Sequence, residues 1–194
     1  MKKLTLLGGV AAAALVACGG GGGGGGGSSI TPTAGTSVAN PFAADAGTYK
    51  SNCSVLNAGQ PFATSESIVA VLDAPVGSDK AKVTVQSQLF TGETCGPATA
   101  KTDDITVRGD LSSLTGTKVI TGAVGEKSGT AKTVEFAFTG LTLSMGSFNF
   151  PTPTLGAKAK AGYLIEGNRI YFLSGARALD GLSPSFSNNF LTKQ

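Results

Sequence analysis

The feature that most constrains how this chain folds is a strict alternation along residues 81–90. Mostly apolar side chains occupy every second position and polar or charged ones lie between them, with Val83, Val85, Ser87 and Leu89 in the first set and Lys82, Thr84, Gln86 and Gln88 in the second. Successive side chains of a β-strand point to opposite faces of a sheet. The stretch therefore predicts a strand with one buried and one solvated face, which is typical of an antiparallel sheet.

Other runs of strand character recur along the chain and are separated by turn residues. They cover residues 48–53, 65–72, 104–108, 118–124, 131–145, 161–166 and 169–174. Gly167-Asn168 predicts a two-residue hairpin between the last two runs, because both residues tolerate a positive φ. Gly140 lies inside its run and predicts a bend or bulge. No stretch predicts a helix, and the tail from Leu179 is expected to be irregular.

The composition favours the same fold class. Only 14% of the residues are charged, Gly, Thr, Ser, Ala and Val are abundant, and Trp and His do not occur. Such a composition is typical of β-structure. About eight strands favour an all-β domain closed into a single antiparallel β-barrel, because closure removes exposed strand edges. A two-sheet β-sandwich is the alternative.

The start of the chain carries a second pattern. Lys2 and Lys3 precede an apolar run over residues 4–16. The end of this run and the two residues after it read Leu15-Val16-Ala17-Cys18. A basic start, a short apolar run and small residues at a cleavage point are the parts of a secretory signal. The run is too short for a spanning helix, which needs about 20 residues. With Cys18 at the cleavage point, the stretch resembles a bacterial lipoprotein signal peptide with its lipobox; the alternative is a secretory signal with an incidental Cys.

This resemblance implies how the protein is held and where. Cys18 would be acylated and become the first residue of the mature chain, and two or more acyl chains anchor a protein stably. Gly19 stands where an Asp favours inner-membrane retention in Gram-negative lipoproteins, which implies an outer-membrane location with the domain facing the periplasm. The predicted organisation is a cleaved signal over residues 1–17, a lipidated Cys and flexible Gly/Ser/Pro linker over residues 18–44, and a β domain over residues 45–194.

The other two cysteines fit an exported protein. Acylation of Cys18 leaves the even pair Cys53 and Cys95, which indicates one disulfide in an oxidising compartment. In the loop-entropy model, closing a loop of some 40 residues stabilises the fold by about 4 kcal/mol. A metal site is the alternative for this pair, although two cysteines without His make a poor ligand set.

The β domain also resembles a loose group of small, uncharacterised proteobacterial lipoproteins. The matching positions are Gly47-Thr48-Tyr49, Cys53, Cys95, Gly167-Asn168 and Asp180-Gly181, while Pro184 falls one place late. The resemblance is thin, its motifs are structural, and it implies no activity.

Few residues indicate chemistry. A chain without His cannot build a His-dependent triad or dyad, and it contains neither Ser-x-x-Lys nor Gly-x-Ser-x-Gly. Asp103 and Asp104 are adjacent, so on a strand they point to opposite faces, and we expect a solvated strand end there. Glu135 and Glu166 lie within strand patterns, where a buried acid would have a perturbed pKa, but an exposed acid beside a Lys is the simpler expectation.

These observations predict a membrane-anchored lipoprotein whose β domain is a non-enzymatic binding or interaction module, without cofactor or metal. An envelope protein is one expected partner. The alternative is a lipocalin-like carrier of a small apolar ligand, whose cavity would be lined by Phe136, Phe138, Phe148, Phe150 and Phe172, although core packing explains these rings more simply. Loss of Lys2 and Lys3 with the signal lowers the formal net charge from +3 to +1. Lysines and arginines do not cluster, so nucleic acid is not an expected partner.

Overall fold

The computed structural model describes residues 39–56, 58–61, 63–96, 101–144, 153–175 and 178–194. The predicted signal peptide, Cys18 and the linker as far as residue 38 lie outside the described residues. Met145, Phe148 and Phe150 also lie outside them.

One 3-10 turn and nine strands occur in the described part of the chain. In chain order they are η1 (Ala43–Asp45), β1 (Gly47–Lys50), β2 (Ser54–Leu56), β3 (Thr64–Asp73), β4 (Lys80–Thr91), β5 (Lys101–Ile120), β6 (Gly129–Ser144), β7 (Lys158–Glu166), β8 (Arg169–Ser174) and β9 (Ser185–Lys193).

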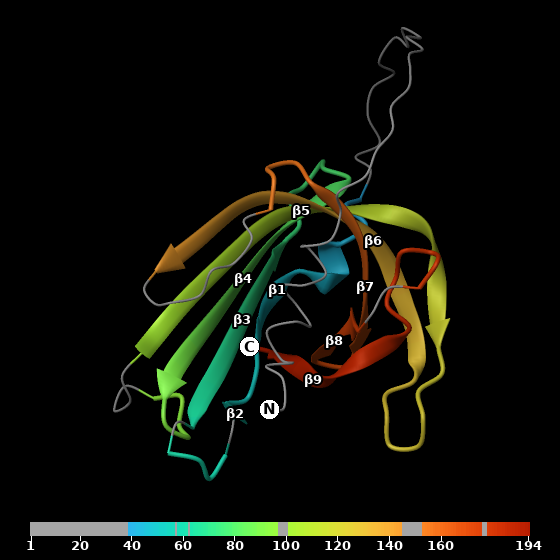
Figure 1. Cartoon of the computed structure of the whole chain (residues 1–194). Coiled ribbons are helices and arrows are strands. Elements are labelled where there is room, and N and C mark those ends of the chain that lie inside the picture. Colours follow the sequence, from blue (N-terminus) through green and yellow to red (C-terminus); the bar gives the residue numbers. More distant parts are fainter. Residues whose placement is uncertain (1–38, 57, 62, 97–100, 145–152, 176–177) are drawn as a thin grey trace, which may run out of the picture.

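The strands form one antiparallel sheet that closes in a ring (Figure 1). The order around the ring is β1-β9-β8-β7-β6-β5-β4-β3, and β1 closes it by pairing with β3. The strand predicted over residues 48–53 corresponds to β1 but ends earlier, at Lys50, and the short β2, which pairs with β3 beyond the end of β1, was not predicted. The described chain is thus all-β and barrel-like, as its alternation and turn residues predicted.

The predicted faces of β4 are confirmed. Val83 and Val85 pack against a core cluster inside the ring, whereas Lys82 is exposed. The inner cluster takes side chains from every strand of the ring and from Phe42, which precedes η1. Its buried members are Phe42, Tyr49, Ala70, Leu72, Ala81, Leu111, Val134, Tyr163, Ile170 and Leu191. A second cluster packs on the other face of the sheet and consists of Ile120, Ala131, Tyr171, Leu173, Leu182 and Phe186.

Residues 101–120 form one strand, so the prediction of two strands over residues 104–108 and 118–124 was wrong. The intervening glycines do not end the strand, because β6 pairs with it on both sides of two irregularities. At the first, Arg108 pairs with Gly140 and Gly109 with Phe138, which leaves one extra residue on β6. The bend or bulge predicted at Gly140 is therefore confirmed.

The tail is not irregular throughout, because β9 spans Ser185–Lys193. This strand pairs with β8 and with β1 and so completes the ring. It buries Leu191 in the inner cluster and Phe186 in the outer one. A strand that is partly buried on both faces lacks a clean alternation, which explains why the sequence pattern did not indicate it.

Packing also begins earlier than the predicted domain start at residue 45. Phe42 is fully buried, and its backbone N–H donates to Asn40 Oδ1 at 2.9 Å. The Asn40 amide in turn donates to the carbonyls of Pro75 and Lys80 at 3.0 and 2.9 Å. These bonds fasten η1 to the β3–β4 turn, so residues 40–44 belong to the folded domain.

The predicted hairpin between β7 and β8 is confirmed. Glu166 pairs with Arg169, and Gly167 in the turn has a φ of +59°. That value lies in the left-handed region, which glycine adopts without steric cost.

Candidate functional site

The inner face of β3 to β6 carries side chains in rows, because the four strands are in register. One row contains Ala70, Val85, Val107 and Leu141, the next contains Ile68, Ser87, Ile105 and Leu143, and a third contains Glu66, Leu89 and Asp103. Neighbouring rows are about 7 Å apart, two residues along a strand.

The second and third of these rows extend beyond the point where the ring closes. β1 pairs with β9 only at Tyr49 and Lys50, opposite Ala70 and Val69 of β3. β7 pairs with β6 only over residues 132–137. Figure 1 shows β3, β4, β5 and the end of β6 running on together past the ring. The inner face of this extension is where polar groups lie among apolar ones.

Glu66 is the most unusual of these polar groups, because its side chain is only 1% exposed. The Ser87 hydroxyl donates to Glu66 Oε1 at 2.7 Å. Glu66 Oε2 is buried, and the described structure provides no hydrogen-bond partner for it. Burial raises the pKa of Glu66, and the hydrogen bond from Ser87 opposes this shift in part.

Solvent reaches part of the inner face between Glu66 and the core. Val85, Val107 and Leu141 are half-buried, although they point inward, and so are Ile68 and Ser87. Farther along the same strands, Leu72, Ala81 and Leu111 are buried. We call Glu66, Ile68, Val85, Ser87, Val107 and Leu141 the inner site.

The inner face around the inner site is acidic. At the described inner-face positions of β3, of β4 and of residues 103–111 of β5, Glu66 and Asp103 are the only ionisable side chains. They flank Leu89, one strand away on either side, so their backbones are about 10 Å apart. No lysine or arginine on these positions neutralises them.

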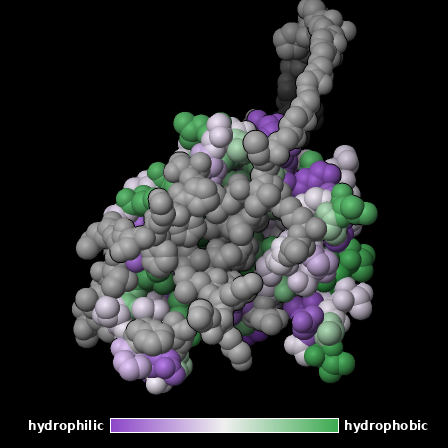
Figure 2. Space-filling model, in the orientation of Figure 1, coloured by the Kyte–Doolittle hydropathy of each residue, from purple (hydrophilic) through white to green (hydrophobic). Residues whose placement is uncertain are grey.

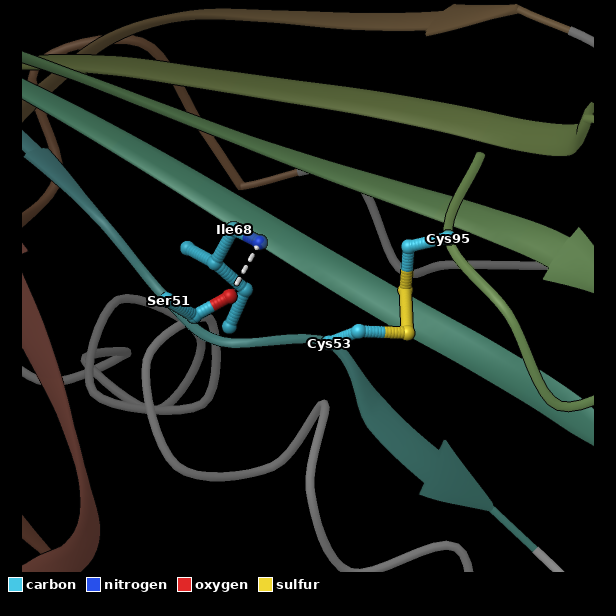
Figure 3. The surroundings of a disulfide bond; sticks show 4 residues. All are labelled: Ser51, Cys53, Ile68 and Cys95. Carbon is cyan, nitrogen blue, oxygen red and sulfur yellow. Dashed lines mark hydrogen bonds between the residues drawn. A yellow bond between two sulfur atoms is a disulfide. The ribbon is translucent and has the colours of Figure 1, made fainter. Parts of the chain in front are cut away.

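A disulfide holds the edge of the sheet beside the inner site (Figure 3). Cys53, in the joint between β1 and β2, is bonded to Cys95 in the segment after β4, with 5.6 Å between their Cα atoms. Two residues earlier, Ser51 Oγ accepts a hydrogen bond from the Ile68 N–H at 2.8 Å, at the point where β1 leaves β3. The predicted disulfide is present, and the alternative of a metal site for this pair is wrong.

A second polar cluster closes the ring near η1. Asp45 Oδ2 accepts from Lys132 Nζ and from the Tyr163 hydroxyl, both at 2.5 Å, and the Tyr49 hydroxyl donates to the Asp45 carbonyl at 2.6 Å. Burial and the neighbouring carboxylate raise the pKa values of Tyr163 and Tyr49. Both phenols therefore stay protonated at neutral pH, and the cluster fixes η1 rather than supplying a base.

The acids singled out in the sequence lie elsewhere. Glu135 forms an ion pair with Lys158 at 2.8 Å, and Glu166 forms one with Lys127 at 2.6 Å. Their acidic side chains are 32% and 61% exposed, respectively, so the simpler expectation of an acid beside a lysine is confirmed for both.

Asp103 and Asp104 point to opposite faces, as predicted. Asp104 accepts two hydrogen bonds from the Gln86 amide, at 2.9 and 3.0 Å. Asp103 is only 8% exposed, so the expectation that both are solvated was wrong for this residue. Its inner-face position follows from its place in the row with Glu66 and Leu89.

Sequence reasoning missed Glu66 itself. Ser65-Glu66-Ser67 begins a strand and reads as a polar strand end, although its parity with Ile68, Ala70 and Leu72 places Glu66 on the inner face. That parity was the available signal. Of the predicted lining rings, Phe136 and Phe172 pack against the inner cluster, and Phe138 is buried.

The described residues contain neither a group of metal ligands nor a membrane-spanning helix. Within them, no group of three or more His, Cys, Asp or Glu side chains is arranged to hold a metal ion. In the same residues, no helix is both long and apolar enough to cross a membrane.

Comparisons with protein-family models, with curated proteins and with solved structures find no match to this chain.

Proposed function

We propose that this protein is an exported lipoprotein whose barrel-like domain is a non-enzymatic binding module. The observation that carries the binding role is the inner site, where half-buried apolar side chains lie beside a buried carboxyl group with an unpartnered oxygen. An unpartnered buried oxygen costs stability, and such groups concentrate at functional sites rather than in structural cores.

Two kinds of ligand are compatible with a binding module, and the inner site favours the smaller one. The large apolar side chains that are most exposed lie in separate turns or ends of strands, namely Val76, Val119, Val124, Leu155 and Leu179. Figure 2 shows apolar residues dispersed among polar ones on the described part of one face. A protein partner needs a contiguous apolar patch, whereas a small apolar ligand needs inward-facing groups like those of the inner site.

The proposed location rests on the start of the chain together with the disulfide. Disulfides persist in oxidising compartments, of which the bacterial periplasm is one. The domain with the Cys53–Cys95 bond would be held at the outer membrane, facing the periplasm, by acyl chains on Cys18. The proposal that the module is not an enzyme rests on the lack of His and of nucleophile motifs.

Membrane fractionation of a Gram-negative host that expresses the full chain tests the anchor. We expect the wild-type protein in the outer-membrane fraction with its amino-terminal Cys acylated, and Cys18→Ser in an unacylated, uncleaved form. Gly19→Asp is the matched control, because it keeps the acylated Cys and is expected to move the protein to the inner membrane. Wild-type protein without acyl chains would refute the anchor.

A further inference from the structure

We propose that the inner site takes a small apolar ligand that carries a protonated amine, with the ammonium group paired to Glu66. This inference rests on the proposed binding function and specifies the chemistry of its ligand. Three observations support the proposal: the hydrogen bonding of Glu66, the charges around Glu66 and the side chains that adjoin Glu66.

One oxygen of the Glu66 carboxyl group has no hydrogen-bond partner in the described structure. Ser87 uses Oε1, while Oε2 faces the buried interior without a partner in the described structure. A carboxylate accepts hydrogen bonds through both oxygens and donates none. A group that completes the ionised form of this site is therefore a donor, and an ammonium group offers three N–H donors together with a charge that compensates the carboxylate.

The charges of the side chains around Glu66 indicate the sign of the charge on the ligand. Glu66 and Asp103 face the same interior, and no cationic side chain lies at the described inner-face positions of their strands. Lys132 is on the inner side of β6, but its ammonium group is already paired with Asp45. A third carboxylate brought in by a ligand would add a like charge to a buried acidic site, which is strongly unfavourable. An anionic ligand is therefore disfavoured.

The side chains next to Glu66 indicate the chemistry of the rest of the ligand. The rows next to Glu66 contribute Ile68, Val85, Val107 and Leu141, all apolar and half-buried. A ligand that covers them removes apolar surface from water, at about 25 cal/mol per Å². These rows extend over about 14 Å from Glu66, which suits a compact amine better than a long acyl chain.

Three compact probes with one cage and different head groups test the inference. They are 1-adamantylamine, 1-adamantanol and 1-adamantanecarboxylate, titrated at neutral pH into the purified full chain in an uncharged detergent, with binding followed by ligand-observed NMR. We expect the amine to bind at least tenfold more tightly than the carboxylate, with the alcohol between them.

Substitutions assign the preference to one residue. Glu66→Gln keeps the size of the side chain and removes its charge, so the amine preference should fall to within about threefold. Glu135→Gln is the matched control, because it removes an acid from the opposite face of the sheet, where Glu135 is paired with Lys158. Its preference should equal that of the wild type. Circular dichroism establishes whether each variant is folded.

Each outcome decides between the claims. An amine preference that Glu66→Gln abolishes supports the inference. Equal binding of the three probes, or tighter binding of the carboxylate, refutes the amine but leaves the binding function standing, as does an amine preference that folded Glu66→Gln retains. If Glu66→Gln does not fold, the order of the three probes on the wild type decides alone. Binding of none of the probes refutes both the inner site and its ligand.

Discussion

Replacing Glu66 by Met should make the protein more stable at neutral pH. The substitution removes a carboxyl group whose Oε2 is buried without a partner and puts an unbranched apolar side chain of similar length in its place. A buried unsatisfied polar group costs about 1–3 kcal/mol. The Ser87 hydroxyl that loses its acceptor is half-buried, so water can replace that acceptor at little cost. We therefore expect the free energy of unfolding to rise by about 1–3 kcal/mol.

The pH dependence of this gain has a definite sign. Because burial raises the pKa of Glu66, the folded state binds this proton more tightly than the unfolded state does. Stability from the protonated form is complete below the ordinary glutamate pKa of about 4.3 and is lost as the pH rises through the raised value. The advantage of Glu66→Met should therefore be smaller at pH 4 than at pH 7.

Urea unfolding of the full chain, followed by far-ultraviolet circular dichroism with the disulfide intact, measures both effects. Glu135→Met is the control, since an exposed ion pair contributes about 0–1 kcal/mol and Glu135 lies in such a pair with Lys158. A Glu66→Met variant that is less stable than the wild type at pH 7, or whose advantage does not change with pH, would refute the reasoning.

Three further predictions concern what holds the ring together, and each is measured as the urea midpoint of the variant against the wild type. Asp45→Ala removes the acceptor of the buried Tyr163 hydroxyl and one side of an ion pair, so we expect a loss of about 2–4 kcal/mol; a loss no larger than that of Tyr163→Phe would contradict this. The double substitution of Cys53 and Cys95 by Ser should cost about 2–4 kcal/mol, since the bond spans a sequence separation of 42 residues, and an unchanged midpoint would count against it. Gly109→Ala puts a Cβ against the Phe136 ring and 2.8 Å from the Ala137 carbonyl oxygen, and it should cost about 1–3 kcal/mol; a neutral result would contradict this.

Much of the fold was predictable from local patterns. The alternation in β4, the Gly167-Asn168 hairpin and the bulge beside Gly140 all depend on neighbours within one or two strands, and each appears in the structure as expected. Ring closure was predictable in kind, because about eight strands without a helix to cover their edges favour a closed sheet.

The features that sequence reasoning missed depend on contacts between distant segments. β9 was missed because it buries side chains on both faces. The long β5 was divided because its pairing with β6, not its own residues, carries it past the glycines. Phe42 was assigned to a linker because a short polar stretch with Pro41 gives no sign that this ring packs in the inner cluster.

The inner site illustrates the same limit. Glu66 lies in a polar stretch, and only the register of β3 with β4 brings it to Ser87 and leaves its second oxygen buried. Its inward parity was visible, but its burial is a property of the folded sheet and not of its local sequence. A residue that breaks the local rule of polar groups outside is a reasonable place to look for function.

Native mass spectrometry of the protein, extracted gently from its own membranes, tests the central claim most directly. We expect a mature chain that begins at acylated Cys18, contains one disulfide and retains a small noncovalent ligand in a constant ratio. An unmodified Cys18 together with a chain that carries no bound molecule would contradict both the proposed anchor and the proposed binding function.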